Sequence, residues 1–141
     1  MPRPALVLGF AGLLPFLAGA AGAWAAGSPA YIIVINMQMA YGAVILSFLG
    51  AVHWGVALAQ DDAARWRRLG FPVAPALAGW LALIMPNPLG LVLLILGFVA
   101  VFFADLRSPG VPAWYKALRK PLTLVTILCL GASYAALVAR L

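Results

Sequence analysis

The chain has 141 residues, of which 66% are hydrophobic and only 9% carry a charge, with a net charge of +6. A soluble domain is about half apolar and roughly a quarter charged, so this composition indicates that lipid is the main solvent of the chain. It excludes a soluble enzyme, a secreted disulfide scaffold and a disordered regulator.

Five segments have the apolar character of membrane-spanning helices, which need about 20 mostly apolar residues. In chain order they are residues 4–26, 32–59, 71–85, 89–104 and 122–139. The third and fourth are short and are joined by Pro86-Asn87-Pro88, which predicts an upright antiparallel hairpin. The sequence therefore predicts an all-α polytopic membrane protein, a single transmembrane domain over residues 1–141 with five spans.

The basic residues support this count and predict an orientation. All but Arg140 lie at the N-terminus or in the connections after spans two and four, whereas the connections after spans one and three carry no charge. This is the positive-inside pattern, and it predicts a cytoplasmic N-terminus and a C-terminus outside. The first apolar run also resembles a signal peptide ending at Ala21-Gly22-Ala23, whose cleavage would leave four spans. We expect retention, because the run is longer than the usual signal-peptide core of about 7–15 residues.

The two connections predicted on the cytoplasmic side are suited to lipid headgroups. Residues 61–68 are expected to form an interfacial helical turn in which Asp61 pairs with Arg65. Before the last span, a short amphipathic helix is expected to present Trp114 and Leu118 on one face. The residues predicted to meet headgroups are Trp66, Arg67, Arg68, Trp114, Tyr115, Lys116, Arg119 and Lys120. Ordinary anchoring is the favoured interpretation, with recognition of a specific lipid or an acidic partner as the alternative, and no nucleic-acid binding is expected.

Span two holds most of the polar groups expected inside the membrane. At about 100° per residue, its small residues Ala43, Ser47, Gly50 and Ala51 lie along one stripe. Small residues let another helix approach closely, and a serine can then bond across the contact. We therefore expect span two to be the central helix of the bundle.

The single histidine, His53, lies beside this stripe. An imidazole exposed to lipid is costly, so we expect His53 to point into the bundle. It could ligate a haem, donate to a quinone carbonyl or handle a proton, and Ser47, Tyr41 and Trp54 would then line the ligand site with it. We favour a neutral histidine that ties two helices together, because there is no second histidine and no carboxylate within a predicted span.

Other chemistry has few residues to draw on. Asp105 is expected to cap the end of span four or to pair with Arg107. One cysteine, one histidine and no glutamate exclude a cysteine-based or multi-histidine metal site within the chain. No catalytic motif is present, so we expect no catalytic residues, no metal and no cofactor, with haem or quinone as the only cofactor alternatives.

Two strings carry a family resemblance. YGAVILSFLGAVHWG (residues 41–55) and WYKALRKPLT (residues 114–123) resemble the transmembrane protein 69-like family of small polytopic proteins in bacterial inner membranes and in mitochondria. The resemblance implies a five-span bundle in the bacterial cell inner membrane, and no reaction. The second string is also partly similar to the tryptophan-rich sensory protein (translocator protein) family, which binds porphyrins and sterol-like ligands. In that family the string precedes the second span and here it precedes the last, so no ligand site is transferred.

These observations favour a non-enzymatic function, as an accessory or structural subunit or an assembly factor of a larger membrane complex. Its partners would be membrane lipids and another integral membrane protein or a second copy of the chain. The alternative is a binding or transport module for a quinone, tetrapyrrole or lipid in a pocket around His53. A lipid-modifying enzyme and an ion-coupled transporter rank last, because general bases and intramembrane carboxylates are scarce.

Overall fold

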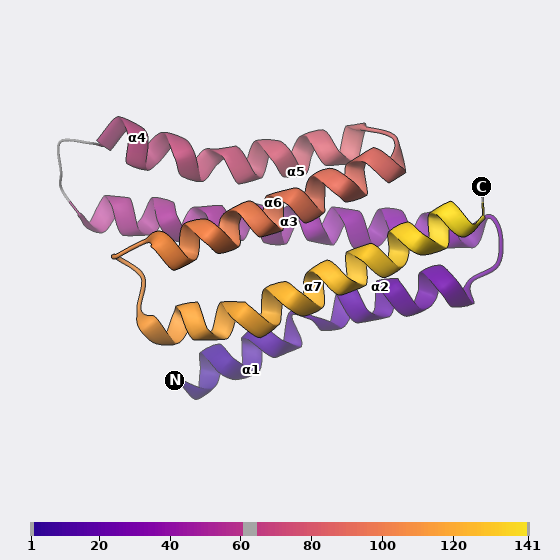
Figure 1. Cartoon of the computed structure of the whole chain (residues 1–141), viewed down its shortest axis with the longest axis horizontal. Coiled ribbons are helices and arrows are strands. Elements are labelled where there is room, and N and C mark those ends of the chain that lie inside the picture. The colour runs from indigo at the N-terminus through magenta and orange to yellow at the C-terminus, as the bar shows by residue number, and fades with distance from the viewer. Residues whose placement is uncertain (1, 61–64, 141) are drawn as a thin grey trace.

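The computed structural model describes residues 2–60 and 65–140, without the side chain of Arg65. Every regular element in this part of the chain is helical. In chain order the elements are α1 (Arg3–Ala11), α2 (Leu14–Ala25), α3 (Ala30–Ala59), α4 (Arg65–Gly70), the 3₁₀ turn η1 (Phe71–Val73), α5 (Ala74–Ile84), α6 (Asn87–Arg107) and α7 (Ala113–Ala139). Figure 1 shows them lying side by side along the long axis of the molecule. The expected helical membrane bundle is thereby confirmed.

The first predicted span is interrupted by a kink between α1 and α2. Pro15 lies in the first turn of α2 and has no backbone N–H to bond the preceding turn, which ends the regular helix there. The carbonyl of Gly12 instead accepts a hydrogen bond of 2.8 Å from the hydroxyl of Tyr41 on α3. A side chain of the neighbouring helix thus satisfies a backbone group within the apolar zone, as helices in lipid require.

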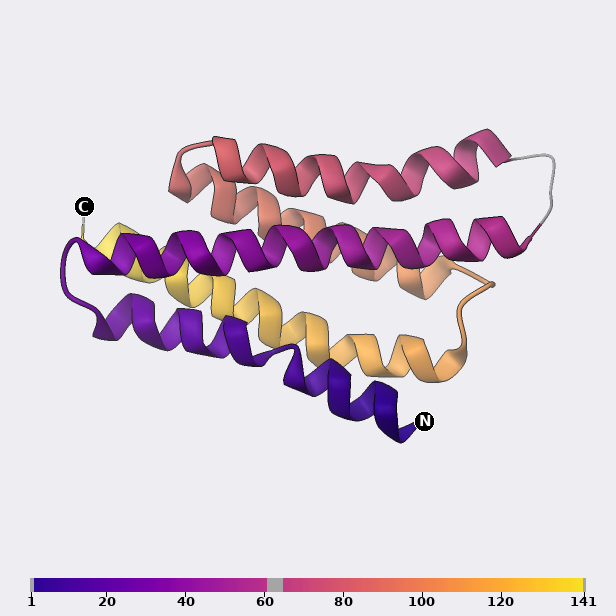
Figure 2. The same cartoon turned by 180° about the vertical axis from the view of Figure 1, so that it is seen from behind.

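Within the described residues, four helical segments are long and apolar enough to cross a membrane, namely Arg3–Ala25, α3, α6 and α7. The third predicted span is different, because α5 has only 11 residues. It continues the line of α4 and η1, and together these elements form a rod that runs beside α3 (Figure 2). The first and last described residues lie at opposite ends of the bundle, as an odd number of crossings requires (Figure 1). A fifth crossing, formed by this rod, therefore stays a prediction.

The predicted interfacial helix before the last span is not a separate element. α7 runs without a break from Ala113 to Ala139 and contains Pro121. A proline within a helix removes one backbone hydrogen bond, here to the carbonyl of Ala117, and Ala117 is exposed. The helix therefore continues through Pro121, and the amphipathic segment forms its first turns.

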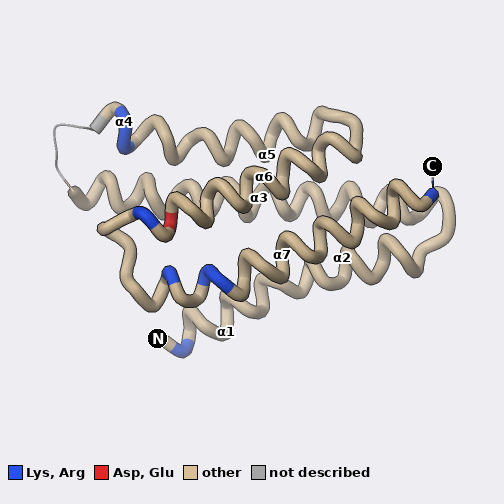
Figure 3. Tube along the Cα trace, viewed as in Figure 1, with Lys and Arg blue, Asp and Glu red and all other residues tan. Residues whose placement is uncertain are grey.

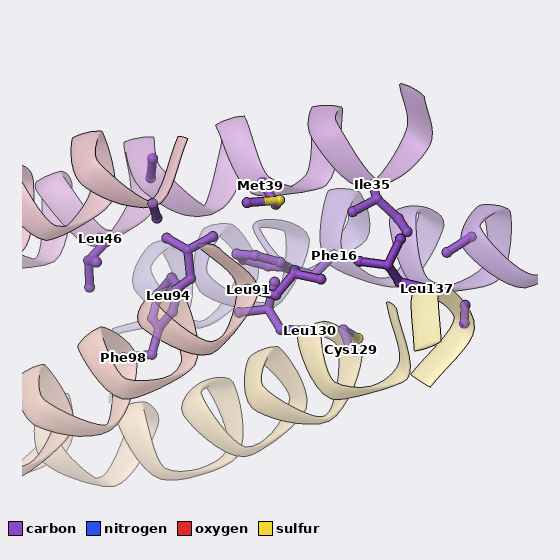
Figure 4. Packing of buried hydrophobic residues seen from close by; sticks show 14 of the residues in the cluster. Phe16, Ile35, Met39, Leu46, Leu91, Leu94, Phe98, Cys129, Leu130 and Leu137 are labelled. Carbon is purple, nitrogen blue, oxygen red and sulfur yellow. The ribbon is translucent and has the colours of Figure 1, made fainter. Parts of the chain in front are cut away.

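The hydrophobic core lies where α2, α3, α6 and α7 meet (Figure 4). The ring of Phe16 on α2 packs edge-on against Phe98 of α6, with ring centroids 5.9 Å apart. The same ring packs against Tyr41 of α3 at 5.0 Å. Leu91, Leu94 and other aliphatic side chains fill the space around these rings. The core thus joins the four longest segments and fixes α3 relative to α6 and α7.

The contact between α3 and the α4–α5 rod depends on small residues. A Cβ added at Gly79 of α5 would lie 3.1 Å from the backbone of Ala43. A Cβ added at Gly50 of α3 would lie 2.5 Å from the carbonyl oxygen of Pro72. Ala43 and Gly50, two residues of the predicted small-residue stripe, therefore lie against another helix of the same chain.

The basic residues gather at one end of the bundle. Figure 3 shows lysine and arginine concentrated at the end where the chain begins, which we call the basic end. At the other end, Arg140 donates a hydrogen bond of 3.0 Å to the carbonyl of Trp24 and lies 4.2 Å from the ring centroid of Tyr31. This spatial segregation is the arrangement that the charge pattern of the sequence predicts.

Candidate ligand pocket

A buried ionic cluster joins α3, α6 and α7 near the basic end. Nε2 of His53 lies 2.6 Å from Oδ1 of Asp105, and Nε of Arg119 donates to Oδ2 of Asp105 at 2.7 Å. The side chain of Asp105 is 0% exposed, that of Arg119 is 6% exposed and that of His53 is 16% exposed. One carboxylate therefore holds an imidazole and a guanidinium inside the protein.

The helical periodicity explains how Asp105 reaches this position. α6 continues to Arg107, beyond the predicted end of span four at residue 104. Asp105 therefore occupies the next place on the buried face formed by Leu94, Phe98 and Val101. The i, i+4, i+7 spacing of these residues was the signal in the sequence that could have placed Asp105 inside the bundle.

Arg119 follows the same rule on α7. It shares a buried face with Thr123, Thr126 and Leu130, at the spacing of successive helical turns. It was expected to meet lipid headgroups, and the structure instead buries it against Asp105. A charged side chain inside a membrane bundle is expected to be paired in this way, because an isolated charge is costly there.

Two expectations for the acidic group are therefore wrong. Asp105 does not pair with Arg107 or serve mainly as a cap, because both of its carboxylate oxygens bind side chains of other helices. The inference that no carboxylate stands near His53 also fails. The predicted span four ends at residue 104, one residue before Asp105, so the prediction leaves this carboxylate outside the membrane zone.

The carboxylate fixes the chemistry of the imidazole. An ionised carboxylate only accepts hydrogen bonds, and Asp105 is already paired with a guanidinium. Nε2 of His53 therefore carries the proton in the contact with Asp105. In the neutral imidazole, Nδ1 then keeps its lone pair and is a hydrogen-bond acceptor.

His53 also lines a cavity of about 680 Å³ between α3, the α4–α5 rod and α6. This volume lies within the range of small-molecule sites, about 300–1,000 Å³. Small residues on all sides leave the space open, among them Gly50, Ala78, Gly97 and Ala100. Arg67, Arg68 and Ser108 line it as well. The cavity is thus mostly apolar, with His53 on its wall.

The four residues predicted to form a ligand site are not brought together. Ser47 donates to the carbonyl of Ala43 in its own helix at 2.9 Å, and Tyr41 is held by Gly12. The indole of Trp54 donates to the carbonyl of Leu69 at 3.1 Å. Ser47 and Trp54 line a smaller hollow together with the exposed residue Ala51, whereas His53 lines the large cavity.

The residues predicted at lipid headgroups have varied surroundings. Trp66 is 93% exposed, which suits an interfacial anchor. The guanidinium of Arg67 lies 5.9 Å from the ring centroid of Phe71, and Arg68 bonds the side-chain oxygen of Gln60. The remaining described residues are exposed or half-buried at the start of α7, namely Trp114, Tyr115, Lys116 and Lys120. The predicted pairing of Asp61 with the side chain of Arg65 lies outside the described residues.

Metal binding finds no support in the described part of the chain, where no cluster of three or more histidine, cysteine, aspartate or glutamate side chains occurs. The ionic cluster has one carboxylate and one histidine, and its third member is a guanidinium, which repels cations. His53 and Asp105 are bonded to each other, and of the two only His53 lines the cavity.

The fold and this site define a multi-pass helical membrane protein with a buried ionic cluster beside an apolar cavity. The chain belongs to the family described as "protein of unknown function (DUF3429)", whose model matches residues 1–135. This confirms the family suggested by the two strings, and neither of the relatives described below carries a name that denotes a catalytic activity.

Two curated relatives are similar over most of the chain. Transmembrane protein 69 of Xenopus tropicalis is 42% identical over 137 residues, which cover 94% of this chain and 54% of the relative. Transmembrane protein 69 of Mus musculus is 36% identical over 141 residues, which cover 90% of this chain and 54% of the relative. The chain thus spans about half the length of these relatives. No solved structure matches it.

Proposed function

We propose that the chain is a membrane-embedded binding protein for a small lipid-soluble ligand, without catalytic activity of its own. One observation carries this proposal: His53 stands on the wall of an apolar cavity of about 680 Å³, with its ring fixed by Asp105. Ligand sites typically combine apolar walls with a few fixed polar groups, as this cavity does. The bacterial inner membrane is the proposed location.

The position of the cavity suits a ligand that arrives from the membrane. Its walls come from membrane-spanning helices α3 and α6 and from the α4–α5 rod. Ala100 of α6 lines the cavity at a position where a larger side chain would fill the space. A quinone, a tetrapyrrole or a lipid tail would be accommodated by such walls, and His53 would orient its polar group.

The test is retention of a small molecule during purification from native membranes. We expect native mass spectrometry in mild detergent to find one bound molecule on the wild-type chain. Ala100→Leu fills the cavity and should remove that molecule. The matched control is Ala18→Leu, because Ala18 is an exposed residue of α2 and does not line the cavity. Equal retention in both variants, or no molecule on the wild type, would contradict the proposal.

A second candidate function, as an accessory subunit or assembly factor, is favoured by an uncovered small-residue face on α7. A Cβ added at Gly131 meets nothing within 4 Å, and the exposed residues Ala135 and Ala139 follow at intervals of four. This spacing is typical of helix contacts in membranes. A membrane partner that copurifies with the wild type and is released by Gly131→Leu, but not by Ala100→Leu, would support this role.

A further inference from the structure

We propose that the group bound opposite His53 is a hydroxyl, so that the ligand is a lipid-soluble alcohol or phenol. Asp105 and Arg119 are then positioning residues, which act on the ligand only through the imidazole. This inference rests on the proposed function, because it names the class of ligand for the same cavity.

The first step is that one ring nitrogen of His53 is already used in a hydrogen bond inside the protein. Nε2 of His53 is 2.6 Å from the carboxylate of Asp105, which is buried and has its other oxygen bound to Arg119. The imidazole therefore cannot turn this nitrogen toward a ligand without leaving a buried carboxylate short of a donor. Loss of such a partner is costly inside a protein.

The second step concerns the nitrogen that remains. Among the described residues, Asp105 is the one bonding partner of His53. The side chain of His53 is 16% exposed and lines the cavity. With the proton on Nε2, Nδ1 presents a lone pair, which matches a group that donates a hydrogen bond.

The third step excludes the other polar groups of lipid-soluble molecules from the position opposite Nδ1 of His53. A ketone, a quinone carbonyl or an ether only accepts hydrogen bonds and would leave Nδ1 unpaired. An ionised phosphate or carboxylate has no proton to give Nδ1, and its charge would be drawn instead to Arg67 and Arg68, which also line the cavity. A hydroxyl donates to Nδ1, and an apolar body attached to it fits the small apolar residues of the walls, such as Ala78 and Gly97.

The experiment uses the single histidine of the chain, because histidine-selective ¹⁵N labelling then reports on one imidazole. The full-length protein is placed in phospholipid nanodiscs, and two probes are compared: 3-pentadecylphenol and its methyl ether. We expect the Nε2-protonated tautomer in the free protein. The phenol should shift the Nδ1 resonance and bind about tenfold more tightly than the ether, as one hydrogen bond allows.

Each other outcome is decisive. Equal binding of the two probes without a change at Nδ1 would overturn the hydroxyl assignment and leave the cavity as a binding site. A doubly protonated imidazole, or tighter binding of the ether, would show that His53 donates and would also overturn it. Binding of neither probe would count against both this inference and the proposed function, and the native-membrane retention experiment tests that function independently.

Variants separate positioning from folding. His53→Leu should bind phenol and ether equally, because the acceptor is gone while the apolar walls remain. Asp105→Asn should change the tautomer populations of His53, since an amide can donate to Nε2, and should reduce the preference for phenol. The wild-type comparison of the two probes needs no variant, so the assignment can be overturned even if Asp105→Asn does not fold.

Discussion

The imidazole Nε2 of His53 and the carboxylate Oδ1 of Asp105 are 2.6 Å apart, although the two residues are 52 positions apart in the chain. This contact joins helices α3 and α6. Nε of Arg119 on α7 donates to the other oxygen of Asp105, Oδ2, at 2.7 Å, so a third helix joins the cluster. The cluster therefore has two effects, because it holds α3, α6 and α7 together and sets the direction of the ring beside the cavity.

The first prediction concerns the stability of the ionic cluster. Arg119→Met leaves the fully buried carboxylate of Asp105 without its cation, and we expect it to lower the free energy of unfolding by about 3–5 kcal/mol. Denaturant unfolding in detergent micelles measures this change. Lys120→Met is the matched control, because Lys120 is exposed and its loss should change stability by no more than about 0.5 kcal/mol.

A double variant tests whether the loss comes from the unpaired charge. Replacing both Asp105 and Arg119 by leucine removes the charge and its partner together, so the double variant should be more stable than the Arg119→Met variant. If the double variant loses as much unfolding free energy as Asp105→Leu and Arg119→Leu lose together when made singly, the two residues act independently.

The next prediction concerns the close contact of α3 with the α4–α5 rod. Gly50→Ala places a Cβ only 2.5 Å from the carbonyl oxygen of Pro72, so one of the two segments must shift. We expect a loss of about 1–3 kcal/mol in thermal or denaturant unfolding. Gly55→Ala in the same helix meets nothing within 4 Å and should be neutral or stabilising. Equal effects at the two glycines would refute this account of the contact.

The five-span topology makes a prediction about the two ends of the chain. The concentration of basic residues at the end where the chain begins predicts that this end is cytoplasmic and that the last residue of α7 is outside (Figure 3). Membrane-impermeant labelling of single cysteines introduced at Pro2 and Arg140, with Cys129 replaced by alanine, should mark only the second in intact cells. Labelling of both positions from the same side would mean an even number of crossings.

Much of the fold could be predicted because apolar length and charge placement act locally. The helical class and the segments that became α3 and α6 follow from apolar runs and their flanking charges, and the structure confirms the bundle. The prediction of a separate interfacial helix before the last span was wrong at Pro121. A proline usually marks a helix boundary, but here its unbonded turn is exposed and the helix continues.

The site was harder to predict because it depends on how three helices are placed relative to one another. The predicted fourth span ends at residue 104, just before Asp105, although the spacing of Asp105 from Val101 and Phe98 places it on a buried face. The sequence draws attention to His53 as its single histidine, but the bonding partner of His53 and the cavity beside it come from residues distant in the sequence. Tyr41, Ser47 and Trp54 of the same span are predicted to hold a ligand together with His53, but in the structure their hydrogen bonds lie elsewhere.

The most direct test of the cavity as a ligand site is photocrosslinking in the native membrane. A diazirine amino acid at Ala104, which lines the cavity, is compared with the same amino acid at Ala18, an exposed residue of α2 that does not line the cavity. We expect position 104 to capture one small lipid-soluble molecule of defined mass and position 18 to capture the bulk phospholipid mixture. Capture of the same phospholipid mixture at both positions would contradict the account.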